Sequence, residues 1–170
     1  MTSYINFNAV YDFVSLFKRQ VYTLSFEEGL DLALMVCKRL YFDYETFVSS
    51  EHWGDNDLLM DAILLCEQSK ANKIENSGLE KMLSKVDTIT PDTEDFGYYN
   101  GSYALNAANS VSETLAFIID KDLEHIFNIG TYLTDTVYFR IQEKQSLPEE
   151  KIDEHPMMTE ARNFLIEQTE

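Results

Sequence analysis

Hydrophobic side chains recur every three or four positions along most of this chain, with polar side chains between them. This is the period of helices that bury one face, and no segment shows the alternation of a half-buried strand. The pattern predicts helices over roughly 7–19, 26–42, 57–69, 76–86, 104–119, 123–145 and 156–165. It weakens near Asp43, so a short separate helix is expected at 44–50. The sequence therefore predicts an all-α bundle of about six or seven helices.

Residues typical of helix ends refine these boundaries. Ser25 precedes Glu28 by three positions, which predicts a capping box. Asn76 and the serine after it are expected to cap the next short helix. Pro156 suits the first turn of the last helix, and the acidic segment 146–154 before it is expected to be a linker.

Small and apolar side chains indicate where the core lies. Ala104, Ala107 and Ala108 share one face of their helix, so we expect that helix to be central because neighbouring backbones can approach it closely. Cys37 and Cys66 both fall within apolar helical patterns. They are expected to be reduced core thiols rather than a disulfide or a reactive site.

Length and composition limit the class of protein. The chain has 170 residues, the size of one domain, so a single helical domain over residues 1–170 is predicted. Hydrophobic residues make up 45%, which argues against disorder despite the high charge. The N-terminus shows no basic segment followed by an apolar one, and no apolar stretch is long enough for a bilayer. We therefore expect a cytoplasmic protein.

The charge is the feature that most limits the choice of partner. There are 13 Lys and Arg residues against 30 Asp and Glu residues, a formal net charge of −17. Residues 1–85 carry 8 basic and 13 acidic side chains (net −5), whereas residues 86–170 carry 5 and 17 (net −12). Such a surface repels nucleic acid and anionic membranes and attracts basic proteins. We expect a basic protein partner, no nucleic acid and no membrane.

The loop at residues 90–99 combines carboxylates with aromatic rings. Its acidic residues are Asp92, Glu94 and Asp95, and its rings are Phe96, Tyr98 and Tyr99. Like charges this close repel one another unless a cation, a basic partner or a helix N-terminus offsets them. Three interpretations stay open: a connector that caps the next helix with Phe96 in the core, a partner-binding loop, and a metal site. The partner-binding candidates are Asp92, Glu94, Asp95, Tyr98 and Tyr99.

A second acidic cluster spans residues 51–57, where Asp55 and Asp57 flank an asparagine. We place both aspartates behind the loop as further partner-binding candidates. The spacing does not match an EF-hand, and Asp55 is also a natural helix cap. Capping and a divalent metal are the alternatives, and no metal site is assigned.

No complete catalytic constellation is visible. His52, His125 and His155 do not pair at metal spacing, and a structural role is expected for each. The sequence lacks a nucleophile elbow, a phosphate-binding glycine loop and a paired CxxC motif. Members of a Ser–His–Asp triad meet only in the folded chain, so that alternative stays open. We predict no catalytic residue and no cofactor.

Four short motifs stand out together: the runs 91–97 (PDTEDFG), 104–108 (ALNAA), 134–137 (TDTV) and 155–158 (HPMM). Taken together, they resemble a bacterial family of unknown function, the YjaG-like proteins. The resemblance extends over most of the chain from Ser25 and implies an all-helical fold with no established activity. It also draws attention to Asp135 and His155, which would meet the carboxylates of residues 92–95 if the loop crossed the last two helices.

These observations favour a non-enzymatic binding protein. The size, acidity and helical character are similar to those of small immunity proteins, which would occlude the basic cleft of a toxin domain. One alternative is a metal-dependent enzyme or metal-binding protein that uses carboxylates and histidine. Another is a helical scaffold or homodimer whose acidity serves solubility.

Overall fold

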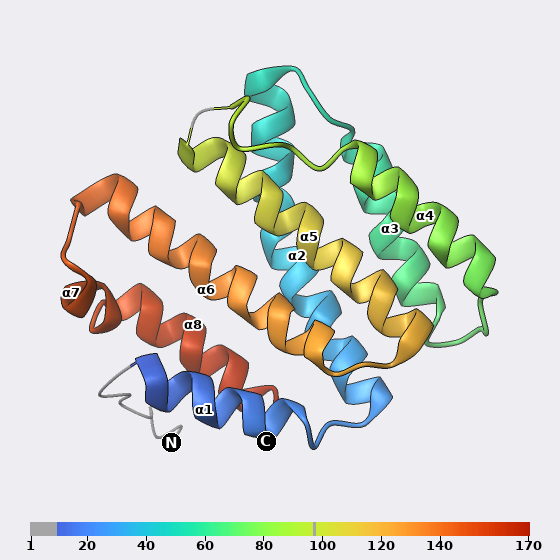
Figure 1. Cartoon of the computed structure of the whole chain (residues 1–170), viewed down its shortest axis with the longest axis horizontal. Coiled ribbons are helices and arrows are strands. Elements are labelled where there is room, and N and C mark those ends of the chain that lie inside the picture. The colour runs from blue at the N-terminus through green and yellow to red at the C-terminus, as the bar shows by residue number, and fades with distance from the viewer. Residues whose placement is uncertain (1–9, 97) are drawn as a thin grey trace.

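The computed structural model describes residues 10–96 and 98–170, which form eight α-helices and no strand (Figure 1). The helices are α1 (Val10–Val21), α2 (Phe26–Glu51), α3 (Asn56–Gln68), α4 (Asn76–Thr88), α5 (Tyr98–Asp120), α6 (Glu124–Gln145), α7 (Glu149–Asp153) and α8 (Pro156–Glu167). The predicted all-α bundle is confirmed for this part of the chain. The capping box of Ser25 with Glu28 and the proline at the start of α8 are also confirmed.

Helix α5 is the centre of the bundle, as the alanine face predicted. It packs against α2, α3, α4 and α6, and Ala104, Ala107 and Ala108 are buried. Cys37 and Cys66 lie in the same core as free thiols. Figure 1 shows α6, α8 and α1 continuing the bundle on one side of α5, with α3 and α4 on the other.

Helix α2 is continuous where the sequence predicted a break near Asp43. Tyr44 and Phe47 extend the buried face that runs from Leu30 to Leu40, so the apolar period does not stop. Asp43 interrupts the pattern because it binds Arg140 of α6, with the carboxylate oxygen 2.5 Å from Nη2. The polar residue at this position is an interhelical ion pair, and the separate helix at 44–50 was wrong.

Two further boundaries differ from the sequence prediction. Glu75, not Asn76 or Ser77, is the N-cap residue of α4, and its side chain makes no capping hydrogen bond. Five residues of the expected acidic linker form α7, which begins after Pro148. Ile152 of α7 is fully buried and packs in an apolar cluster with residues of α6 and α8, which anchors this short helix.

Helices α6, α7 and α8 enclose a second, smaller apolar cluster beside the main core. It consists of Val137, Ile141, Ile152, Met158 and Ala161. Helix α1 closes the bundle against α6 at Gly130, where an added Cβ would lie 2.3 Å from the ring of Phe17. In the described ranges, no helix is both long and apolar enough to cross a membrane.

Candidate functional site

Tyr44 joins the two acidic segments that the sequence singled out. Its side chain is fully buried, and its hydroxyl donates a 2.6 Å hydrogen bond to the carbonyl oxygen of Ile89, which follows α4. The same oxygen accepts a 3.4 Å hydrogen bond from the backbone N–H of Asp55. Burial raises the pKa of Tyr44 to about 12, so the hydroxyl keeps its proton at neutral pH. One side chain thus ties the turn before α3 to the segment after α4.

Three aromatic rings hold the same two segments together. Phe47 of α2 is buried, and Phe96 packs against it with 4.9 Å between ring centroids. Trp53 completes the group, 5.2 Å from Phe96 and 6.1 Å from Phe47. Gly54 makes the turn at φ +96°, where an added Cβ would lie 2.6 Å from the hydroxyl of Tyr44. The interpretation of Phe96 as a core contact is therefore confirmed.

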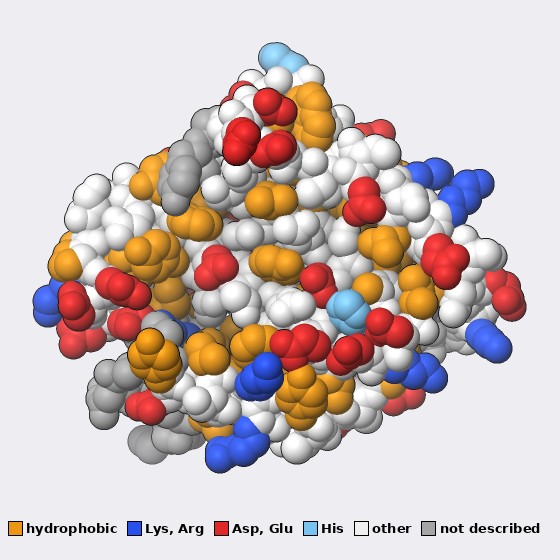
Figure 2. Space-filling view, viewed as in Figure 1, with side chains coloured by type: hydrophobic (Ala, Val, Ile, Leu, Met, Phe, Trp, Pro, Cys, Tyr) orange, Lys and Arg blue, Asp and Glu red, His pale blue; other side chains and the backbone are white. Residues whose placement is uncertain are grey.

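Five carboxylates project from these anchored segments, and we call them the acidic edge: Asp55, Asp57, Asp92, Glu94 and Asp95. All five are exposed. Within residues 10–96 and 98–170, none of them forms an ion pair with Lys, Arg or His. Figure 2 shows acidic side chains gathered at the top of the molecule, over the end of α2 and the loop before α5. The acidic edge therefore presents negative charge to solvent.

Two members of the acidic edge also satisfy backbone groups. Asp55 caps α3, because its carboxylate accepts a 2.9 Å hydrogen bond from the N–H of Leu58. The carboxylate of Asp92 accepts a 3.0 Å hydrogen bond from the N–H of Glu94. The capping interpretation of Asp55 is confirmed. Each carboxylate keeps further lone pairs for another donor.

The two tyrosines of the predicted site begin α5. The side chain of Tyr98 lies outside the described residues. Tyr99 is half-buried, and its ring stacks on Tyr103 with 6.4 Å between centroids. The hydroxyl of Tyr103 donates a 2.8 Å hydrogen bond to Glu143 of α6. The structure thus connects Tyr99 to α6 through Tyr103.

Asp135 and His155 do not meet the acidic edge. Asp135 lines a groove formed with α1, α7 and α8. His155 caps α8 by accepting a hydrogen bond from the N–H of Met157, and its other ring nitrogen lies 3.1 Å from Gln145. The loop at residues 90–96 instead packs on α2 through Phe96, so the expected meeting across the last two helices was wrong.

A histidine network that the sequence did not predict joins α5 to α6. Nδ1 of His125 lies 2.5 Å from Glu113, and Nε2 lies 3.1 Å from Asp120. Burial alone would lower the pKa of His125, but the hydrogen bonds to both carboxylates outweigh it and raise the pKa. When His125 is protonated, both ring nitrogens donate, one to Glu113 and one to Asp120, so the two carboxylates stabilise the cationic form of the ring. Glu113 and His125 are separated by a helix break, which hides their proximity in the sequence.

The aromatic groove was also missed. It lies between α1, α6, α7 and α8, has a volume of about 400 Å³ and includes two carboxylates without an ion pair in the described ranges, those of Asp135 and Glu149. Its aromatic residues fit the ordinary pattern of buried helix faces, so their spacing in the sequence did not indicate a groove. Among the described residues, no group of three or more His, Cys, Asp and Glu side chains could share a metal ion.

The fold and the acidic edge define a class: an all-helical bundle that presents unpaired carboxylates from two joined segments. The chain belongs to the DUF416 family of proteins of unknown function, whose model matches residues 16–169. It is similar to the crystal structure of a DUF416 family protein from Shewanella baltica OS155, with 27% identity and a TM-score of 0.76. The match covers 90% of this chain and 83% of that one. No curated protein matches the chain. The expectation of an all-helical family of unknown function is confirmed.

Proposed function

We propose that this protein is a non-enzymatic, cytoplasmic binding protein whose acidic edge holds a basic protein partner. The partner that best suits a small, strongly acidic inhibitor is a toxin domain with a basic substrate cleft, which would make this chain its immunity protein. The observation that carries the proposal is that five exposed carboxylates, none of them in an ion pair within the described ranges, lie on two segments that Tyr44 joins.

The anchoring of the acidic edge supports a binding role. Tyr44, Phe47 and Phe96 hold the two segments against the core, so the segments that carry the carboxylates are already ordered before a partner binds. Preorganisation lowers the entropic cost of association. Placing like charges together is unfavourable in the free protein, and a basic partner would relieve that repulsion. The arrangement therefore favours a partner with matching Lys and Arg side chains.

The mechanism follows from long-range attraction and steric cover. Opposite charge increases the rate of encounter, and this effect decreases as salt screens it. Carboxylates that pair with Lys and Arg in the cleft would prevent an anionic substrate from entering. The bound inhibitor needs no chemistry of its own.

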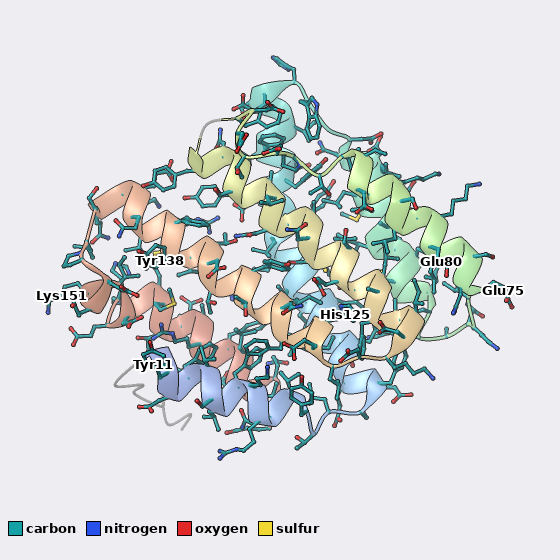
Figure 3. All side chains as sticks on the ribbon, viewed as in Figure 1. Tyr11, Glu75, Glu80, His125, Tyr138 and Lys151 are labelled. Atoms are coloured by element: carbon teal, nitrogen blue, oxygen red, sulfur yellow. The ribbon has the colours of Figure 1, made fainter. Side chains whose placement is uncertain are left out.

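The test compares two variants of equal net charge. Glu94→Gln/Asp95→Asn removes two charges from the acidic edge. Glu75→Gln/Glu80→Gln removes two exposed charges at the start of α4, which Figure 3 labels, whereas Glu94 and Asp95 follow the other end of that helix. Cytochrome c and lysozyme serve as basic probe proteins, and association rates are measured by stopped flow at low and physiological ionic strength.

We expect the edge variant to slow association at low salt by about three- to tenfold, and the α4 variant to change it by less than about twofold. Both variants should keep the helical circular dichroism of the parent. Equal effects of the two variants would show that only net charge matters, and would refute a specific acidic edge. A second test searches the neighbouring genes for a basic toxin domain and measures whether this chain protects cells that express it. Loss of protection in the edge variant alone would support the immunity role, and unchanged protection would contradict it.

A further inference from the structure

The groove between α1, α6, α7 and α8 combines aromatic walls with acidic residues. Figure 3 shows this region between Tyr138 of α6 and Tyr11 of α1. Its volume is about 400 Å³, within the usual range for small-molecule sites. The rings that line it are Phe13, Phe17, Phe127, Tyr138 and Phe139. Phe13 and Phe17 are almost fully buried, so the floor is fixed by the core.

The groove contains more acidic than basic side chains. Arg162 is its only cation among the described lining residues, and it is 3% exposed. Its guanidinium binds Asp153 at 2.6 Å and lies over the ring of Phe13. The other two acids, Asp135 and Glu149, have no ion pair within residues 10–96 and 98–170. The groove therefore keeps two carboxylates that no cation of its own balances.

Of these two acids, Asp135 is the better placed to bind a cation. The surrounding side chains shield its carboxyl from part of the solvent, which raises its pKa, although the residue remains exposed at the rim. A cation beside it would replace the hydration that the carboxylate has lost. Aromatic faces attract cations as well, most strongly when the cation is an organic ammonium group with apolar substituents.

We propose that this groove binds a small organic cation, with the ammonium group at Asp135 and the apolar body against the aromatic walls. The occupant follows from charge complementarity, because two unbalanced carboxylates disfavour an anion and give a neutral ligand no advantage. The groove shares no residue with the acidic edge. This site is therefore independent of the proposed partner binding.

The test uses three probes of similar shape and different charge: phenethylammonium, 2-phenylethanol and phenylacetate. Each is titrated into the full-length protein and followed by NMR chemical shifts of groove residues. We expect the cation to bind at least about tenfold more tightly than the neutral or anionic probe. Asp135→Asn should weaken cation binding about tenfold and leave the neutral probe unchanged. Phe139→Leu should weaken both.

The matched control is Asp61→Asn, which removes an exposed carboxylate from α3 and should leave all three affinities unchanged. Equal binding of the cation and the alcohol would reduce the site to a plain apolar groove and overturn the proposal. Preferred binding of phenylacetate, or no binding of any probe, would overturn it too. Nuclear Overhauser contacts from the groove to residues 1–9, or a mass that rises with concentration, would show that the chain itself fills it and would also refute the inference.

Discussion

The hydroxyl of Tyr44 offers the sharpest test of how the acidic edge is held. Tyr44→Phe removes one oxygen and keeps the buried ring. The 2.6 Å bond to Ile89 is lost, which leaves a carbonyl oxygen without its donor at a residue only 8% exposed. An unsatisfied buried polar group costs about 1–3 kcal/mol. The 3.4 Å bond from Asp55 is long, and the exposed residue can turn to water, so it adds little. We expect a loss of about 2 kcal/mol in the free energy of unfolding.

Urea unfolding followed by two signals measures this loss. Trp53 is the only tryptophan, and it packs on Phe96 beside the acidic edge, so its fluorescence reports on this junction. Circular dichroism reports on the helices. Tyr11→Phe is the control, because Tyr11 is 81% exposed and should change stability by less than about 0.5 kcal/mol. If Tyr44→Phe also stays within about 0.5 kcal/mol of the parent, the hydroxyl does not hold the two segments together and the reasoning fails.

Two further predictions concern the turn and the histidine network. Gly54→Ala should lower the free energy of unfolding by more than about 1 kcal/mol, because φ is +96° and the new Cβ would meet the hydroxyl of Tyr44; an unchanged melting temperature would contradict this. His125 has a raised pKa in the folded protein, so its stabilisation is complete below about pH 6.5 and is lost as the pH rises through the folded value. His125→Gln should therefore reduce the loss of stability that the parent shows above pH 6.5. The measurement is the urea midpoint as a function of pH. An unchanged pH dependence in the variant would show that the network with Glu113 and Asp120 does not stabilise the fold.

The helical bundle could be predicted because most helices bury a single face with a regular period. The errors occurred where one residue had a tertiary role that its type does not reveal. Asp43 was interpreted as a break because a carboxylate is unusual on an apolar face, yet it binds Arg140 across the bundle. The segment at 146–154 was interpreted as a linker because it is acidic, although five of its residues form α7 and Ile152 is buried.

The candidate sites were predictable to a smaller extent. The sequence pointed to the carboxylates of the acidic edge because they are clustered along the chain, and the hydrogen bonds of Tyr44 bring the backbone of Asp55 near the segment after α4. Partner binding by these residues stays a prediction. The bond from Tyr44 to Ile89 that joins the two segments spans 45 positions and has no local signature. The aromatic groove draws on α1, α6, α7 and α8, so its residues become neighbours only after the helices pack. The family resemblance drew attention to Asp135, but the sequence did not indicate that this residue lies beside an aromatic groove.

The balance of charges explains why this chain has two acidic surfaces available to ligands. Seven of the 13 Lys and Arg side chains form ion pairs in the described structure, so internal cations cannot balance 30 carboxylates. The remaining charge must be met by counterions or by a ligand. The acidic edge is fully exposed, so salt should screen its attraction strongly. Asp135 is partly shielded by the groove, so salt should weaken cation binding there much less. We therefore expect the association rate at the acidic edge to depend strongly on salt and the affinity for a cation in the groove to depend on it weakly. This difference would show that the two sites bind their ligands independently.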